Sequence, residues 1–298
     1  MKKHAYLLIA YHQFDLLKKL IGLLDDPHHD IFVHIDAKTQ EFHPEDFNGI
    51  VKYSKLYFTD RTSVSWGGWS MIRCELLLLK QAKRTGEYAY YHLLSGQDLP
   101  LHPAGEIYRF FSEHEGKEFI HYIANPKGID AKGRIAQYWL FQDRVGRSRG
   151  MLRIVQKIAV RLQRIIGIDR TRRIGRPAAV GANWFSITDS LAEYVLQQEN
   201  WIRKYFMYTR CADEMFLQML VEETPFYENL YMPNSQGDCR SCMRYIDWKR
   251  GKPYTFTSDD YNELLHSDCM FARKFDWDKD AQICLRLEHA LLNDSAGS

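Results

Sequence analysis

The residues best suited to chemistry are Asp213 and Glu214, which stand at the start of a helical pattern. Apolar residues recur at helical spacing from Met215 to Leu220, so Asp213 is placed to cap the helix and Glu214 falls in its first turn. The helix dipole would keep a Glu214 carboxylate ionised and fixed in direction, as a general base requires. The alternative is that the pair only begins a helix, because acidic residues are common in first turns.

Two further carboxylates follow predicted strands. Asp36 ends the strand-like run 30–36, and Asp98 lies in a turn directly after the run 88–94, where Pro100 prevents continued strand pairing. Ligands of open α/β sheets bind at the carboxyl ends of strands, so both residues are candidates for ligand contact. The alternative for each is an aspartate that caps turn amides.

Tryptophans mark two other candidate positions. Trp66 lies in the run 63–70, where two tryptophans flank a Gly-Gly pair, and Trp184 lies in a strand predicted over 181–188. The first run favours a loop with close backbone approach and an aromatic platform, with buried packing tryptophans as the alternative.

The elements that must position these residues open as β-α-β. The run 5–10 is a short buried strand, apolar residues from Leu16 to Leu24 mark one face of a helix, and 30–36 is a second strand. This order indicates a parallel α/β sheet. Neither a dinucleotide-binding glycine fingerprint nor a phosphate loop is present, which disfavours both of those enzyme classes.

Composition places the chain among ordinary globular proteins. It has 298 residues, 45% hydrophobic and 26% charged, and no apolar run long enough to cross a membrane. No signal-cleavage pattern follows Met1, so we expect a cytoplasmic protein. Of six scattered cysteines only Cys239 and Cys242 have the spacing of a zinc knuckle or redox pair, and without two more ligands free thiols are expected.

Charge is concentrated in one segment. Residues 127–176 hold fourteen Lys and Arg against three Asp, although the whole chain carries only +2. Within this segment, a helix over 151–166 has an apolar face with cations set between its residues. We expect this helix to make peripheral contact with an anionic membrane. The alternative is a helix that packs on its own domain and exposes a solvated basic face. Few aromatics interleave with the cations, which disfavours nucleic acid as a partner.

Six motifs in register then resemble one family. They are His-Ile-Asp-Ala-Lys (34–38), Ser-Val-Ser-Trp-Gly-Gly-Trp-Ser (63–70), Leu-Ser-Gly-Gln-Asp-Leu-Pro-Leu (94–101), Gly-Ala-Asn-Trp-Phe (181–185), Asp-Glu (213–214) and Phe-Ala-Arg-Lys-Phe-Asp (271–276). The series is similar to the core-2/I-branching β-1,6-N-acetylglucosaminyltransferase family, which includes the peptide O-xylosyltransferases. The match runs from about residue 5 to residue 276 and is of a bacterial type.

The resemblance implies a GT-A-like α/β fold with a Rossmann-like, mostly parallel central sheet flanked by helices. It implies one catalytic domain over 1–298, made of a nucleotide-binding half (1–125), a basic insertion (126–177) and an acceptor and diphosphate half (178–298). It also implies an inverting transfer of GlcNAc or xylose from a UDP-sugar to a glycan hydroxyl, with neither a metal nor another cofactor.

Residue roles follow from the same resemblance. Glu214 matches the base that deprotonates the acceptor, and Arg244 and Lys274 match the cations that hold the donor diphosphate. Arg240 remains a substitute for Arg244. Asp36 and Trp66 match nucleotide and donor contacts, whereas Asp98, Trp184 and Asp213 are assigned to the acceptor or sugar site, Asp213 as the helix cap that aims Glu214.

Two features qualify the match, and a rival interpretation stands beside it. Asp276 and Asp278 form an Asp-x-Asp pair, but it follows the diphosphate lysine near the C-terminus, so we reject it as a metal motif. His121 or a neighbour stands where an acceptor-binding Glu is expected, which favours a surface polysaccharide, free or lipid-linked, over a mucin-type acceptor. The rival interpretation is a non-catalytic protein that binds a nucleotide sugar or lipid headgroup.

Overall fold

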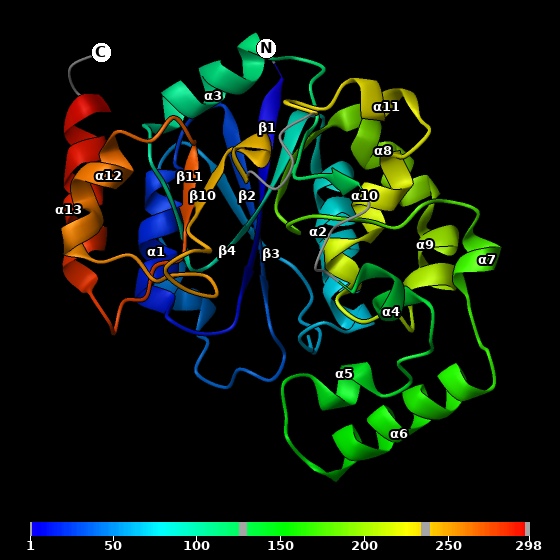
Figure 1. The fold of residues 1–298 in the computed structure, drawn as a ribbon. Helices are drawn as coiled ribbons and strands as arrows, with labels where there is room; N and C mark the ends of the chain where they lie inside the picture. The colour runs from blue at the N-terminus through cyan, green and yellow to red at the C-terminus, as the bar shows by residue number, and fades with distance from the viewer. Residues whose placement is uncertain (1, 125–129, 234–238, 296–298) are drawn as a thin grey trace.

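A six-stranded sheet forms the centre of the molecule in the computed structural model, which describes residues 2–124, 130–233 and 239–295 (Figure 1). Its strand order is β3-β2-β1-β4-β9-β6. The four strands from β3 to β4 are parallel, and β9 runs antiparallel to both of its neighbours. The strands are β1 (Lys3–Ala10), β2 (His29–Ile35), β3 (Lys55–Phe58), β4 (Tyr88–Ser95), β6 (Phe119–Ile120) and β9 (Phe185–Thr188).

Helices cover both faces of this sheet. One face is covered by α1 (Phe14–Leu23) and α13 (Ala281–Ser295), and the other by α2 (Trp69–Thr85), α8 (Asp189–Gln197) and α10 (Phe216–Val221) (Figure 1). The α/β class, the β-α-β opening and the mostly parallel sheet predicted from the sequence are therefore confirmed. The predicted boundary between the first two parts of the chain falls on residues 125–129, outside the described residues, as does Lys127.

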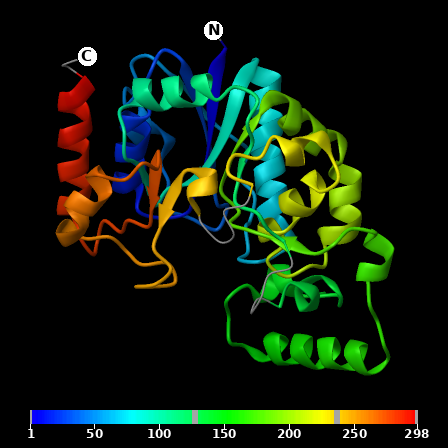
Figure 2. The same cartoon turned by 45° about the horizontal axis from the view of Figure 1, so that its top comes forward.

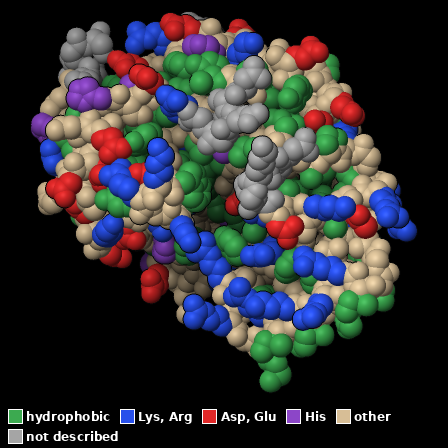
Figure 3. All heavy atoms as spheres, in the orientation of Figure 1, with side chains coloured by type: hydrophobic (Ala, Val, Ile, Leu, Met, Phe, Trp, Pro, Cys, Tyr) green, Lys and Arg blue, Asp and Glu red, His purple; other side chains and the backbone are tan. Residues whose placement is uncertain are grey.

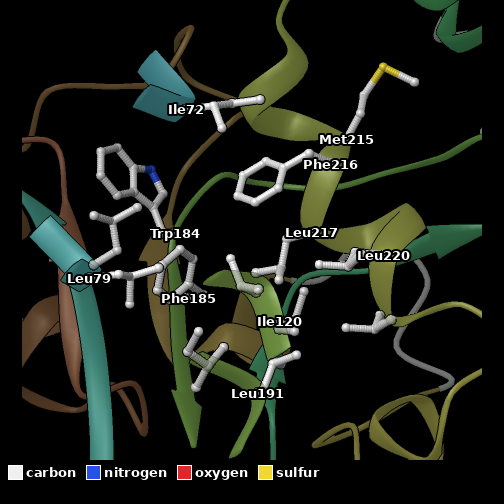
Figure 4. Packing of buried hydrophobic residues seen from close by; sticks show 14 of the residues in the cluster. Ile72, Leu79, Ile120, Trp184, Phe185, Leu191, Met215, Phe216, Leu217 and Leu220 are labelled. Atoms are coloured by element: carbon white, nitrogen blue, oxygen red, sulfur yellow. The ribbon is translucent and has the colours of Figure 1, made fainter. Parts of the chain in front are cut away.

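Alternation along β1 explains the two cores. Ala5 and Leu7 belong to the apolar cluster on the α2 side, whereas Tyr6 and Leu8 belong to the cluster on the α1 side. Successive side chains of a strand point to opposite faces, so a strand buried on both sides is apolar throughout. On the α2 side, Trp184 and Phe185 pack among side chains of α2 and α10 (Figure 4).

Two smaller sheets complete the described strands. One has the order β10-β11-β5, formed by β10 (Arg244–Ile246), β11 (Phe271–Arg273) and β5 (Asp98–Pro100). The prediction that Asp98 lies in a turn and that Pro100 prevents strand pairing is therefore wrong, because Asp98 and Pro100 pair with Arg273 and Phe271 of β11. The other pairs β7 (Ile123–Ala124) with β8 (Ala179–Val180).

The remaining helices lie around this core. They are α3 (Ala104–Glu113), α4 (Ala131–Ile135), α5 (Gln142–Val145), α6 (Met151–Ile165), α7 (Thr171–Ile174), α9 (Glu199–Phe206), α11 (Pro225–Glu228) and α12 (Tyr261–Leu265), with 3-10 turns η1 (Pro44–Phe47), η2 (Ala212–Glu214), η3 (Cys239–Cys242) and η4 (Ser258–Asp260). The helix α6 forms one edge of the molecule, away from the central sheet, in both orientations (Figures 1 and 2). Within the described residues, no helix has the length and apolar character to cross a bilayer.

All six cysteines are buried free thiols. The prediction of free thiols is confirmed.

Candidate active site

The turn that carries Glu214 differs from the predicted helix start. Ala212–Glu214 is a 3-10 turn, and α10 begins only at Phe216, with Met215 as its N-cap residue. Cys211 has φ 49° and ψ 49°, so the chain reverses there before the turn. The prediction that Asp213 caps the helix is therefore wrong, and Glu214 is not held by that helix dipole.

Contacts to neighbouring segments hold Glu214 instead. Its carbonyl accepts a hydrogen bond from the Gly181 amide at 2.9 Å, and its carboxylate Oε2 accepts one from Arg134 Nη1 at 2.6 Å. The Glu214 side chain is 37% exposed. The carboxylate is thus fixed in position while one side stays open to solvent or a ligand.

Arg134 was not among the residues predicted from sequence. It lies in α4, inside the basic segment, and no spacing rule connects it with a residue eighty positions later. The only signal was the excess of cations in that segment, which does not identify the one that reaches Glu214.

A second, buried carboxyl pair lies behind the base. Asp213 and Glu75 of α2 are both buried, and within the described structure Asp213 Oδ1 has no hydrogen-bond partner. Burial, and next the charge of Glu214, raise the pKa of Asp213 to about 7. Burial and Asp213 raise the pKa of Glu75 well above its ordinary value. Both effects favour neutral carboxyls next to the ionisable Glu214.

Arg244 lies in the protein interior. It is 1% exposed, and its guanidinium donates to Ser186 Oγ at 2.8 Å and to the carbonyls of Phe185 at 2.7 Å and Leu93 at 3.1 Å. Burial lowers the pKa of Arg244. These bonds tie β10 to β4 and β9, so the prediction that Arg244 holds a donor diphosphate is not supported by its position. The alternative residue, Arg240, is exposed in η3.

Asp98 and Trp184 both contact Arg273. Asp98 is 1% exposed, and its Oδ1 lies 2.6 Å from Arg273 Nη1. Its two oxygens also accept from Ser95 N and Ser95 Oγ, each at 2.8 Å. The Arg273 guanidinium lies over the Trp184 ring, 4.4 Å from its centroid. Asp98 therefore orients Arg273, which is a different role from the predicted contact with acceptor or sugar.

Lys274 follows Arg273 directly and is partly buried. Burial lowers the pKa of Lys274, and the nearby charges of Arg273 and Arg147 lower it further, whereas Asp276 raises it. Arg147, in turn, lies 4.8 Å over the Trp66 ring. Lys274, Arg147 and Trp66 therefore bring together the C-terminal motif, the basic segment and the tryptophan loop.

The tryptophan loop is joined to the Glu214 turn. The Cys211 amide donates to the Gly67 carbonyl at 2.9 Å, and Gln142 Nε2 donates to the Trp66 carbonyl at 3.1 Å. Gly67 has φ +66°, and an added Cβ there would lie 3.1 Å from Cys211 Sγ. This close approach explains the Gly-Gly pair between the tryptophans.

Asp36 follows β2, at the predicted carboxyl end of the strand. Its Oδ1 accepts from the Lys38 amide at 2.9 Å, and its Oδ2 lies 3.4 Å from Lys38 Nζ. The turn-capping interpretation therefore describes one of its oxygens, and the other faces the Lys38 ammonium, which also donates to the Val64 carbonyl.

The two remaining candidates have local partners. Asp276 Oδ1 accepts from Gln13 Nε2 at 2.7 Å and from the Asp278 amide at 3.2 Å. His121 is buried, and its Nδ1 accepts from the Ala182 amide at 3.0 Å. In the described parts of the chain, no group of three or more His, Cys, Asp or Glu side chains could hold a metal ion.

Comparison with known proteins now places this arrangement in a family. Residues 4–269 match the family model described as Core-2/I-Branching enzyme. The chain belongs to this family. Its predicted family resemblance is confirmed, and the matched range includes the Glu214 turn, the tryptophan loop and the Arg134 helix.

Curated relatives are more distant and longer. Xylosyltransferase 2 of Bos taurus is 24% identical over 305 residues, which cover 96% of this chain and 33% of the relative. A β-1,3-galactosyl-O-glycosyl-glycoprotein β-1,6-N-acetylglucosaminyltransferase of Bos taurus is 23% identical, covering 93% of this chain and 66% of the relative. This chain spans about a third of the length of the xylosyltransferases that it matches.

Two transferases are among the solved structures to which this chain shows a distant likeness. Mouse xyloside xylosyltransferase 1 in its apo form has a TM-score of 0.38 at 9% identity, covering 91% of this chain and 97% of that one. Core-mannan synthase A of Aspergillus fumigatus in its Mn/GDP form has a TM-score of 0.34 at 13% identity, covering 75% and 71%.

Proposed function

We propose that this chain is an inverting, metal-independent glycosyltransferase with a GT-A-like fold. It moves GlcNAc or xylose from a UDP-sugar to a hydroxyl of a glycan acceptor. The observation that carries the proposal is the Glu214 carboxylate, which is partly open to solvent and accepts a hydrogen bond from Arg134, while the Gly181 amide holds the Glu214 backbone carbonyl. Family membership and the transferases among its relatives support the same assignment.

In the proposed reaction, Glu214 accepts the proton of the acceptor hydroxyl. The hydroxyl oxygen then attacks the anomeric carbon while the bond from that carbon to the diphosphate oxygen breaks. UDP leaves with the bonding electrons, so negative charge grows on the diphosphate and requires a fixed positive partner. Attack from the side opposite to the leaving group inverts the anomeric configuration.

Lys274 is the cation that we assign to this charge, with Arg147 as its second member in place of the buried Arg244. Lys274 is only partly buried; burial is the first cause of its lowered pKa, and the positive charges of Arg273 and Arg147, which the negative charge of Asp276 offsets only in part, lower it further. A diphosphate between the two cations would supply that charge. Arg273 is less available, because its Nη1 is bonded to Asp98.

The nucleotide and the acceptor use the other surfaces of this region. Asp36 is assigned to the uridine and Trp66 to the donor, since Trp66 is 39% exposed and lies beside Arg147. Trp184 and Asp98 contact Arg273 and position its guanidinium, and Asp213 is the buried carboxyl next to Glu214. We propose a surface polysaccharide as the acceptor, with membrane-facing cytoplasm as the setting.

UDP release tests the proposal. UDP-GlcNAc, UDP-xylose and UDP-galactose are each incubated with the protein and a panel of oligosaccharide and lipid-linked acceptors, and free UDP is measured. We expect acceptor-dependent UDP release with one of the first two donors. A protein whose melting temperature rises with UDP, but which releases no UDP with any combination, would instead be a non-catalytic nucleotide-sugar binder.

A further inference from the structure

The helix α6 exposes the apolar side that an ordinary surface helix buries. Most of its apolar side chains face solvent, whereas Val160 and two of its glutamines are buried, the glutamines at 3% and 9% exposure. A helix that packs on its own domain normally buries its apolar stripe. The exposed apolar residues are Met151, Ile154, Val155, Ile158, Leu162, Ile165 and Ile166.

The buried glutamines attach α6 to the protein. Gln163 accepts from the Tyr138 amide at 2.7 Å and donates to the Tyr138 carbonyl at 3.0 Å. Gln156 accepts from the Phe141 amide at 2.9 Å and donates to Gln142 Oε1 at 3.0 Å. These four bonds fix the rotation of the helix and so hold its apolar side outward.

Cations flank the apolar side. Lys157, Arg161 and Arg164 line a surface hollow of about 470 Å³ together with Trp139 and Val160. Between Arg144 and Ile168 the sequence contains no Asp or Glu. Lys and Arg side chains lie around the exposed hydrophobic groups at this edge of the molecule (Figure 3).

The position of α6 suits a flat partner. The helix lies at one edge of the molecule with the rest of the chain on its other side (Figures 1 and 2). A second copy of the same face would bring its Lys157 and Arg161 against those of the first and be repelled, although Arg164 has a partner in Asp130 at 3.8 Å. An anionic bilayer offers both an apolar interior for the exposed side chains and negative headgroups for the cations.

We propose that α6 is an interfacial helix that binds the surface of an anionic phospholipid membrane. Its exposed apolar residues enter the boundary between headgroups and acyl chains. Lys157, Arg161 and Arg164 bind lipid phosphates, with one phosphate in the hollow beside Trp139. This inference goes beyond the proposed catalysis and does not depend on it.

Vesicle sedimentation tests the inference. The full chain is mixed with sucrose-loaded vesicles of phosphatidylcholine, either alone or with phosphatidylglycerol at about a third of the lipid. We expect the protein to sediment with the anionic vesicles and to dissociate from them as the salt concentration is raised. With the neutral vesicles, the protein should remain in the supernatant. Failure to sediment with anionic vesicles at low salt would overturn the proposal.

Two pairs of variants examine the mechanism. Ile158→Glu/Leu162→Glu removes the apolar side, and we expect at least a tenfold loss of vesicle binding. Leu292→Glu, on an exposed leucine of α13, is its control and should bind as the unaltered protein does. Lys157→Glu/Arg161→Glu should also lose binding, whereas Lys52→Glu/Lys117→Glu, with the same change in net charge elsewhere on the surface, should lose far less.

Two outcomes would contradict the inference. Equal binding by Ile158→Glu/Leu162→Glu and the unaltered protein would show that α6 does not carry the interaction. A dimer in analytical ultracentrifugation without lipid, abolished by the same variant, would instead assign this face to a second copy. Circular dichroism checks that each variant is folded, which is expected because the altered side chains are exposed.

Discussion

Glu214 acts, in our proposal, from a carboxylate that already has a cationic partner. Arg134 lies 2.6 Å away and is itself mostly buried, so it fixes the carboxylate before an acceptor arrives. The second carboxylate oxygen has no such contact with Arg134, which leaves it for the acceptor hydroxyl. The raised pKa values of Asp213 and Glu75, the carboxyl pair behind it, limit further negative charge next to the base.

The raised pKa of Asp213 predicts that the stability of the protein depends on pH. The fold raises the pKa of Asp213 to about 7, so the folded protein holds this proton where the unfolded chain has lost it. Stability therefore falls as pH rises from the unfolded pKa, near 4, through the folded pKa. Asp213→Asn should remove this loss, and its stability relative to the unaltered protein should rise by about 2 to 3 kcal/mol between pH 5 and pH 8.

Urea unfolding of both proteins at each pH measures that difference, in which the other titrating groups cancel. Parallel curves for the two proteins would show that Asp213 does not titrate in this window. Glu118→Gln is a useful comparison, because burial also raises the pKa of Glu118 to about 7, at a position away from Glu214.

Variants at Arg244 and Lys274 distinguish a cation that stabilises the fold from one that binds the donor. Arg244→Met removes the donors that satisfy buried carbonyls of Leu93 and Phe185, so we expect a loss of about 3 kcal/mol of stability. Lys274→Met should change stability by about 0.5 kcal/mol or less but weaken UDP binding at least tenfold. Thermal unfolding and calorimetric titration with UDP measure the two effects. Normal UDP affinity in Lys274→Met would remove that residue from the donor site.

At the scale of elements, strands and long helices could be predicted because their pattern is local. The runs 5–10, 30–36 and 88–94 are strands with ends shifted by at most two residues. The strand predicted over 181–188 begins only at Phe185. The Glu214 helix start could not be predicted, because the left-handed Cys211 and the contact with Gly181 depend on segments distant in sequence.

Gly181 supplies a prediction at this scale. Its amide binds the Glu214 carbonyl, and an added Cβ would lie 1.7 Å from the His121 carbonyl oxygen. Gly181→Ala must therefore displace backbone, and we expect about 3 kcal/mol of destabilisation together with a loss of activity. Gly150→Ala, where an added Cβ meets no atom within 4 Å, is the control and should be nearly neutral. Unchanged stability and activity in Gly181→Ala would contradict the described packing.

For the whole molecule, the sequence predicted the α/β class, the basic segment and six motifs, but not which side chains meet. Arg134 and Arg147 are two of fourteen cations in residues 127–176, and only the fold brings them to Glu214 and Trp66. The apolar periodicity of α6 was visible, but the direction of its apolar face was not. The buried Gln156 and Gln163 determine that direction, and the spacing of glutamines in a sequence does not predict which of them are buried.

The proposed set of cations predicts independence from divalent metals. Because Lys274 and Arg147 already supply two positive charges for the diphosphate, we expect UDP release at the same rate with saturating EDTA as with manganese. Initial rates under both conditions measure this. A strict manganese requirement would contradict the cation assignment and return attention to Asp276 and Asp278.

The most direct test of the account compares Glu214→Gln with the unaltered protein in a single assay of UDP release and UDP affinity. We predict that acceptor-dependent release falls by about 10² to 10⁴-fold, since a general base is lost, while the dissociation constant for UDP stays within about threefold. The isosteric amide can still accept a hydrogen bond from Arg134, so the fold is expected to persist. Full turnover in Glu214→Gln would contradict the assignment of Glu214 as the base.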